Sequence, residues 1–247
     1  MLSERALELD STIAEPHATL GYVAMYHTWD WPAAEREYRR AIAINPSYPT
    51  AHESYGLFLA AMGRYEEAQA EERRAVELDP LSLGIQSTAG WVLHYSGKQA
   101  DAERQLRIAV RTDSTFPVAH LYLGRVLQFN GQLDSALAQF AATGRLRAWV
   151  PTVAGEGYVY AQQGRRDKAQ AVLDSLAALS RTQYVTAYAV ALVHAALGQR
   201  DSAFVWLNKA VDERTHWVLW LNRDRRWDPI RSDERFRAIV RRVKLPD

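Results

Sequence analysis

The sequence contains no cysteine in 247 residues. Disulfides, thiolate nucleophiles, iron–sulfur clusters and the common cysteine-ligated zinc sites are therefore excluded. Long apolar runs are also missing, since no stretch approaches the roughly 18 consecutive apolar residues that a membrane-spanning helix needs. The start, Met1 to Arg5, shows neither the basic patch nor the apolar run of a secretory signal. We therefore expect a soluble protein without a membrane span.

Net charge is also small, at +1 from 30 Lys/Arg against 29 Asp/Glu. The charge is uneven, because residues 214–247 carry ten Lys/Arg against five Asp/Glu. Five of these cations lie within ten residues, at Arg235, Arg237, Arg241, Arg242 and Lys244. A phosphate-rich partner is one interpretation. We favour a solvated helix face, because the rest of the chain is mildly acidic, and nucleic acid is therefore an unfavoured partner.

A short phrase, glycine and then alanine five positions later, recurs along the chain. The steps between its glycines are 34, 34, 33 and 34 residues, as the following pairs show: Gly63/Ala68, Gly97/Ala102, Gly131/Ala136, Gly164/Ala169 and Gly198/Ala203. Repetition at this period is typical of a solenoid, in which each unit buries its apolar face against its neighbours. A broad surface is then the first place to look for function.

Each unit has the pattern of two helices. In residues 49–80, apolar or small residues recur at spacings of three and four on either side of Gly63. Glycine is suited to a reversal there, because it accepts positive φ without a Cβ penalty. Small residues recur in register in the first helices, as at Gly56 and Gly124, and in the second helices at the alanines. Bulky residues four positions after the alanines should fill the space that the small ones leave, namely Tyr38, Leu106, Phe140, Leu173 and Leu207.

This pattern resembles the tetratricopeptide repeat: a small residue, then Leu-Gly, an aromatic, Gly, Ala, Phe and Pro over 34 residues. Residues His120 to Gly124, with Leu127, Gly131, Ala136 and Phe140, carry it most fully. The resemblance implies an all-α, right-handed α-solenoid (superhelix) of antiparallel helix pairs with a C-terminal capping helix. We expect six units within residues 14–214, with these boundaries: 14–48, 49–82, 83–116, 117–149, 150–183 and 184–214.

The two ends differ from the repeats. Residues 215–247 carry apolar residues with interleaved arginines and should form a capping segment, with Phe236, Ile239, Val240 and Val243 on its inner face. The run Asp224 to Phe236 is similar to the closing segment of repeat regions at the C-terminal end of bacterial multidomain regulators, in which winged-helix, kinase or cyclase domains precede the repeats. This resemblance favours a cytoplasmic location, or a periplasmic one within a membrane-anchored regulator. Residues 1–13 read as the second helix of an incomplete repeat, which favours a lost upstream segment or a homodimer.

Catalytic and metal-binding motifs are missing or incomplete. His17, His52 and His120 occupy one place in their units, which favours packing over metal ligation. His52-Glu53 begins like a zinc peptidase helix, but position 56 is glycine. Gly155-Glu156-Gly157 has no preceding strand. The remaining acidic pattern is that of a solvated helix face, with these members: Glu66, Glu67, Glu71 and Glu72. We expect no cofactor, no metal and no enzymatic activity.

In the family resembled, the first helices line a concave groove, and residues about two positions from the Leu-Gly stripe face into it. Aromatic residues predominate at these positions, and rings with a polar edge suit recognition. The candidate binding residues are Tyr22, Tyr26, Glu53, Leu57, Trp91, His94, Tyr95, Arg125, Gln128, Phe129, Tyr158, Gln162 and Tyr188. We weight most strongly Trp91, Tyr95, Arg125 and Phe129, because monomers seldom leave apolar patches unused.

Three functions remain open on this reasoning. The favoured one is a non-catalytic scaffold that binds a protein or peptide segment through the groove. The second is the sensory or docking region of a bacterial transcriptional regulator or kinase whose output domain lies upstream. The third is an enzyme hidden in the repeats, which the empty motif search disfavours. In some members of the family resembled, Lys and Asn at the groove positions of adjoining first helices bind a partner's terminal carboxylate. This chain has Glu53, Ser87 and Leu121 at these positions instead.

Overall fold

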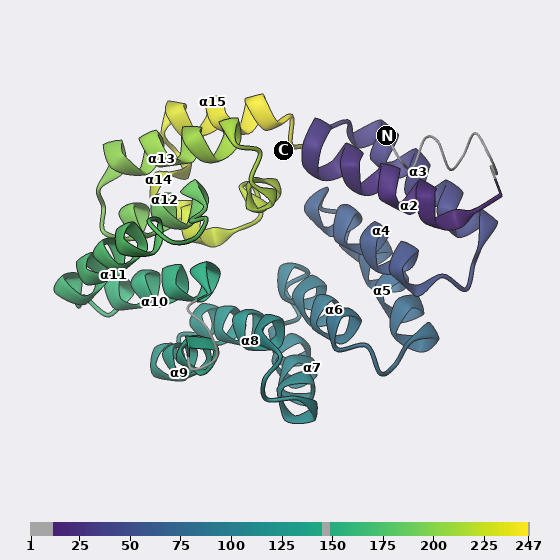
Figure 1. Cartoon of the computed structure of the whole chain (residues 1–247), viewed down its shortest axis with the longest axis horizontal. Coiled ribbons are helices and arrows are strands. Elements are labelled where there is room, and N and C mark those ends of the chain that lie inside the picture. Colours follow the sequence, from purple (N-terminus) through teal and green to yellow (C-terminus); the bar gives the residue numbers. More distant parts are fainter. Residues whose placement is uncertain (1–11, 145–148, 247) are drawn as a thin grey trace. The chain divides into compact units, whose positions relative to one another are not determined.

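The computed structural model describes residues 12–144 and 149–246, and this part of the chain is helical without strands. Residue contacts divide the chain into two compact units, 1–105 and 106–245. The division falls inside helix α7 (Gln99–Thr112). Figure 1 shows the helices in chain order, as successive pairs joined by short turns. The all-α solenoid of helix pairs expected from the sequence is therefore present.

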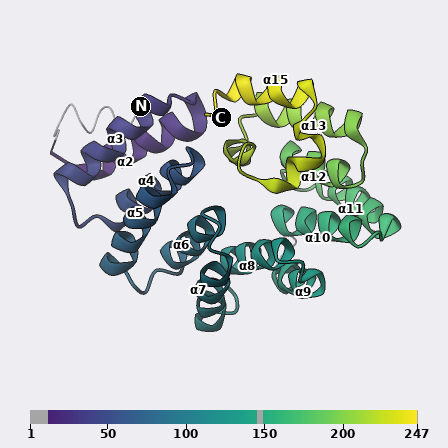
Figure 2. The same ribbon diagram turned by 180° about the vertical axis from the view of Figure 1, so that it is seen from behind.

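Unit 1 contains two complete pairs and the start of a third. Helix α2 packs on α3, and α4 packs on α5, while α4 also contacts α2 and α6. Figures 1 and 2 show α4 beside α5 from both sides. The bounds are α2 (Ala14–Val23), a π-helical turn η1 (Ala24–Thr28), α3 (Trp31–Ile44), α4 (Pro49–Ala61), α5 (Tyr65–Leu78) and α6 (Leu83–Tyr95).

Unit 2 contains three pairs and a closing segment. Helices α8 and α9, α10 and α11, and α12 and α13 pack as pairs, and α10 also contacts α8 and α12. Their bounds are α8 (Pro117–Phe129), α9 (Leu133–Gly144), α10 (Val150–Gln162), α11 (Arg166–Leu179), α12 (Ala187–Ala196) and α13 (Arg200–Asp212). The closing segment consists of two 3₁₀ turns and two helices: η2 (His216–Trp220), η3 (Arg225–Trp227), α14 (Asp228–Arg231) and α15 (Glu234–Val243).

The turn within a pair depends on one left-handed residue. Gly63, Gly131 and the equivalent glycines of three other pairs adopt φ between +73° and +82°. The first pair lacks this glycine, and Trp29 adopts φ +55° instead. Asp30 then caps α3 by accepting a hydrogen bond from Ala33 N at 3.0 Å, with Pro32 in the first helical turn. The sequence signal for the reversals is therefore confirmed.

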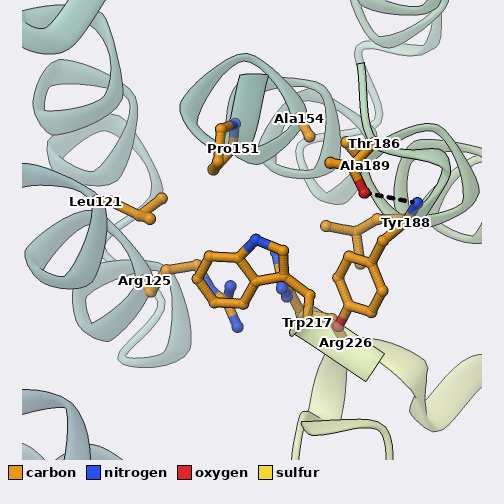
Figure 3. Close-up of a pocket in the computed structure, with 10 residues that line it drawn as sticks. Leu121, Arg125, Pro151, Ala154, Thr186, Tyr188, Ala189, Trp217 and Arg226 are labelled. Carbon is orange, nitrogen blue, oxygen red and sulfur yellow. Dashed lines mark hydrogen bonds between the residues drawn. The ribbon is translucent and has the colours of Figure 1, made fainter. Parts of the chain in front are cut away.

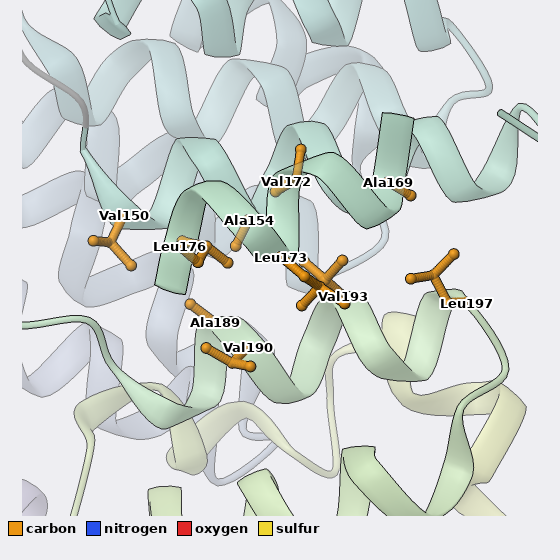
Figure 4. Packing of buried hydrophobic residues seen from close by; sticks show 10 residues of the cluster. All are labelled: Val150, Ala154, Ala169, Val172, Leu173, Leu176, Ala189, Val190, Val193 and Leu197. Atoms are coloured by element: carbon orange, nitrogen blue, oxygen red, sulfur yellow. The ribbon is translucent and has the colours of Figure 1, made fainter. Parts of the chain in front are cut away.

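The helices of a pair approach closely where a small residue of the first meets a large one of the second. A Cβ added at Gly124 would lie 2.3 Å from Cε1 of Phe140, and one at Gly21 would lie 2.7 Å from the Tyr38 ring. The next pair along unit 2 builds its core from aliphatic side chains of α10, α11 and α12, among them Val150, Leu173, Leu176 and Val193 (Figure 4). Interlocking of this kind fills the interior at the density typical of proteins.

One pair fills this place with a glutamate. Glu72 stands four residues after Ala68, where Phe140 follows Ala136, and its Oε1 would lie 2.6 Å from a Cβ at Gly56. The expectation that Glu71 and Glu72 lie on a solvated face is therefore wrong. Glu72 is only 2% exposed, and Glu71 is half-buried beside His52. Spacing from Ala68 predicts a core position there, but the charged residue type obscured it.

The closing helix α15 packs against α13, with Phe236, Ile239, Val240 and Val243 buried. Its exposed arginines are paired with acids, since Arg235 contacts Asp201 and Asp233, and Arg242 contacts Asp212. The expected N-terminal half-repeat lies almost wholly in residues 1–11, outside the described residues, so the half-repeat and the homodimer through it stay predictions.

Replacing Gly124 by alanine should destabilise unit 2, because the new Cβ would meet the Phe140 ring at 2.3 Å. Overpacking of this kind costs about 1–3 kcal/mol. Gly84, also helical, has its nearest neighbour at 3.7 Å. Gly84→Ala is therefore the matched control and should be neutral or stabilising by up to about 1 kcal/mol. Urea unfolding followed by circular dichroism measures both, and equal free energies of unfolding would contradict the packing argument.

Candidate functional site

The candidate binding residues fall in both units, and the two sets differ in the residues that they contact. In unit 1 they lie on α2, η1, α4 and α6, and in unit 2 they lie on α8, α10 and α12. Those of unit 1 contact one another and other side chains of unit 1. Four of those of unit 2 contact the closing segment, namely Arg125, Phe129, Tyr158 and Tyr188.

Asp224 of the closing segment is the centre of the unit 2 contacts. Its Oδ2 lies 2.9 Å from Nη2 of Arg125 and 2.7 Å from Nη2 of Arg226. All three side chains are buried. Tyr188 donates its hydroxyl to the same oxygen at 3.3 Å and accepts a bond from the Trp227 indole N–H at 2.8 Å. One carboxylate thus joins α8, α12 and the closing segment.

A small, partly open pocket lies beside three partners of Asp224, namely Arg125, Tyr188 and Arg226. Figure 3 shows the Trp217 indole between Arg125 of α8 and Tyr188 of α12, with Pro151 and Ala154 of α10 on another side. The room for a solvent molecule inside is about 20 Å³. This is space for about one water, and the closing segment therefore fills the site rather than leaving a ligand-sized pocket.

Charge and burial act against each other at this cluster. Burial raises the pKa of Asp224, but the guanidinium groups of Arg226 and Arg125 outweigh it and hold this pKa well below 3.8. Burial raises the pKa of Tyr158 to about 12, and its hydroxyl donates to the Arg226 carbonyl oxygen at 3.1 Å. Asp224 is therefore ionised, and the tyrosines are neutral, at physiological pH.

The other unit 2 candidates also meet partners within the unit. The Gln128 side chain donates to Gln162 Oε1 at 2.9 Å, which links α8 to α10. Phe129 is 41% exposed, and the Arg225 guanidinium lies 4.9 Å from its ring centre. The expectation of an open groove lined by Arg125, Tyr158 and Tyr188 is corrected here, because the chain's own closing segment covers these side chains.

In unit 1 the candidates range from exposed to buried. Tyr22 is 48% exposed, and its ring centre lies 4.5 Å from that of Tyr26. Glu53, Leu57 and Tyr95 are half-buried. We call these five residues, which lie on α2, η1, α4 and α6, the first-helix face of unit 1.

Two further candidates of unit 1 are buried. Trp91 is 1% exposed, and its ring packs against those of Tyr95 and His94, with ring centres 4.8 Å and 5.6 Å away. His94 in turn contacts Gln99 Oε1 through Nδ1 at 2.8 Å. The expectation that the Trp91 ring contacts a ligand is therefore corrected, because this ring is buried in the interior of unit 1.

The histidines at the repeated position serve the helix pairs. Nδ1 of His17, His52 and His120 faces Glu37, Glu71 and Gln139 of the second helix, at 2.8, 2.6 and 2.8 Å. In the part of the chain that the structure describes, no three His, Asp or Glu side chains gather as metal ligands. The packing interpretation of these histidines agrees with these contacts.

Sequence reasoning missed Thr88, Glu72 and Asp224 as members of either site. Thr88 donates its hydroxyl to Glu53 Oε1 at 2.9 Å. Asp224 lies in the run that resembles the closing segment of bacterial regulators, so the sequence did point to this residue. Nothing in the sequence pattern predicted its contact with Arg125, 99 residues earlier.

Replacing Asp224 by asparagine should destabilise unit 2 by about 3–5 kcal/mol, because Arg125 and Arg226 would lose their buried counter-charge. The stabilisation is fully present above the ordinary carboxyl pKa of 3.8, decreases as pH falls below 3.8, and is lost once pH reaches the lowered pKa of Asp224 in the folded protein. Asp201, 93% exposed and paired with Arg235, is the control, and Asp201→Asn should cost less than about 1 kcal/mol. Urea titrations at several pH values would refute the assignment if the two variants behaved alike.

Replacing Glu72 by glutamine should stabilise unit 1 at neutral pH. Burial, and then the charges of Glu53 and Glu71, raise the Glu72 pKa well above 4.5. The folded carboxyl is therefore protonated, and folding becomes less favourable as pH rises above 4.5. The gain in Glu72→Gln should be on the order of 1–3 kcal/mol at neutral pH and shrink toward pH 4.5. Thermal unfolding across pH tests this, with exposed Glu66→Gln as the control that should show no such trend.

The comparisons with known proteins agree on the fold. A family model described as "Tetratricopeptide repeat" matches residues 28–82, and a second of the same description matches 117–142 and 152–175. No curated protein is similar enough in sequence to match the chain.

Solved structures are similar at low sequence identity. PilW, a type IV pilus biogenesis factor, is 21% identical, with a TM-score of 0.62 over 73% of this chain and 84% of PilW. The Cut9–Hcn1 complex of APC/C is 16% identical, with a TM-score of 0.67 over 98% of this chain and 45% of the matched chain. TTC0263, a TPR protein of Thermus thermophilus, is 21% identical, with a TM-score of 0.56 over 80% of this chain and 100% of TTC0263. These likenesses concern the fold alone. Within the described residues, every helix is too short or too polar to cross a membrane.

Proposed function

Because two parts of this chain match tetratricopeptide-repeat models, we propose that it is a non-catalytic scaffold that binds a protein or peptide segment through the first-helix face of unit 1. The observation that supports this most is the contrast between the two units. The equivalent side of unit 2 is filled by the chain's own closing segment, through Asp224 and its neighbours. In unit 1, by contrast, a tyrosine pair remains accessible, with Tyr22 48% exposed.

The composition of this face suits recognition. Tyrosine rings bury a large area with few rotatable bonds and keep a polar edge for hydrogen bonds. Leu57, half-buried on α4, adds an aliphatic contact beside Glu53. Large accessible aromatic side chains on a folded surface are typical of interaction sites. We therefore expect a partner segment to lie along α2, α4 and α6.

A photo-cross-linking amino acid in place of Tyr22 should capture this partner in cells. Tyr184, 69% exposed before α12, is the matched control, since it is also an accessible tyrosine but belongs to unit 2. We expect a product with the Tyr22 substitution that the Tyr184 substitution does not give. In a Leu57→Arg background this product should be lost while helicity is retained. The same products from both positions, or products unaffected by Leu57→Arg, would refute the assignment.

A second proposal concerns context. The segment from Asp224 to Phe236, whose resemblance to the end of bacterial regulators the sequence suggested, packs onto unit 2 as its closing element. This supports the repeats being the sensory or docking part of a transcriptional regulator or kinase with its output domain upstream. Genomic sequence upstream of the codon for Met1 tests it, and an unrelated gene directly upstream would contradict it.

Nucleic acid remains an unfavoured partner under this proposal. Four exposed arginines of α15 are each paired with an acid: Arg235 with Asp233, Arg237 and Arg241 with Glu234, and Arg242 with Asp212. Each pairing lowers the positive potential that a phosphate backbone would require.

A further inference from the structure

From the charges on the first-helix face of unit 1, we infer that the partner segment presents an arginine or lysine side chain to Glu53. This inference rests on the proposed function and specifies its chemistry. Glu53 lies on α4, and the Thr88 hydroxyl of α6 donates to its Oε1 at 2.9 Å. Over residues 12–144 and 149–246, burial and the Thr88 hydrogen bond are the influences on the Glu53 carboxyl, and no lysine or arginine forms an ion pair with it. The carboxyl is half-buried, and this burial raises its pKa.

A second carboxyl lies directly behind Glu53. Glu72 of α5 points at α4, since its Oε1 would meet a Cβ at Gly56, one helical turn beyond Glu53. Neither of its oxygens has a hydrogen-bond partner, and the side chain is 2% exposed. An aromatic ring occupies this place in the α8–α9 pair, where Phe140 packs on Gly124. An unpartnered buried carboxyl costs stability that a ring would not, so packing alone does not account for it.

The two carboxyls oppose one another's ionisation, because the Glu53 charge raises the pKa of Glu72. A cation placed at Glu53 by a partner would offset the negative charge concentrated there. Tyr22 lies on α2, which packs beside α4, and its ring centre is 4.5 Å from that of Tyr26 in the following turn η1. Tyrosine faces also attract cations. A carboxylate with aromatic rings on the adjacent helix is chemistry that selects a guanidinium or ammonium group.

Unit 2 shows how this chain satisfies a charge on its first helices. There Arg125 of α8 is met by the carboxylate of Asp224, which arrives from a separate segment at 2.9 Å. Glu53 has the opposite sign and no such counter-charge among the described residues. By charge complementarity, the partner segment carries a positive charge at Glu53, just as the closing segment places the negative charge of Asp224 at Arg125.

The probe for this inference is N-acetyl-L-arginine methylamide, titrated into the whole isotope-labelled protein and followed by NMR. N-acetyl-L-citrulline methylamide, of the same shape without the charge, is the matched ligand. We expect saturable shifts at the amides of Glu53 and Thr88 with the arginine probe and not with citrulline. Glu53→Gln should weaken arginine binding about fivefold, as expected for loss of one partly exposed ion pair. Exposed Glu66→Gln is the matched variant and should leave the affinity unchanged.

Equal affinity in wild type and Glu53→Gln, or equal shifts with citrulline, would overturn the inference. So would the absence of shifts at Glu53 up to the solubility of the probe. Cross-links from Tyr22 that persist in such a case would retain the proposed function and reject only the cationic partner. Self-association that depends on Glu53, measured by light scattering, would identify a second copy of the chain as the occupant and also overturn it.

Discussion

The close approach of two helices within each pair is the constraint on which the structure depends. In several pairs a glycine of the first helix meets a large side chain of the second at a distance that leaves no room for a Cβ, as at Gly124 and Phe140. This contact fixes which side of the first helix faces its partner. The remaining sides of the first helix must then face the neighbouring pairs or the surface. The contact within the pair therefore limits where a candidate binding residue on that helix can lie.

The features that repeat could be predicted from the sequence, because they depend on residues close together in the chain. Gly63 and its equivalents end one helix and begin the reversal within a few residues, and Phe140 follows Ala136 by one turn. The covering of unit 2 could not be predicted in this way. Asp224 contacts Arg125 across 99 residues, and no periodicity relates them. For Glu72, the register was readable, but its charge favoured the opposite interpretation.

The two units also differ in how they treat buried charge. In unit 2, Asp224 lies between two guanidinium groups, and its ionised form is stabilised. In unit 1, Glu72 has no partner and is held in its neutral form, while Glu53 receives a single hydrogen bond from Thr88. The same kind of scaffold thus holds a carboxylate with cationic partners in unit 2 and, among the described residues, carboxyls without a cationic partner in unit 1. The first stabilises a self-contact, and the second is the arrangement expected where a partner supplies the missing charge.

The long separation between Arg125 and Asp224 also affects how the chain emerges from the ribosome. The helix pairs of unit 2 make mostly local contacts and can form as each pair is completed. The carboxylate that neutralises Arg125 is synthesised 99 residues later. Until then, Tyr158 and Tyr188 also lack the partners that the closing segment brings. Each nascent chain therefore passes through an interval in which unit 2 presents an uncovered aromatic and cationic surface to the cell, and this interval ends only after the segment around Asp224 and Arg226 has been synthesised.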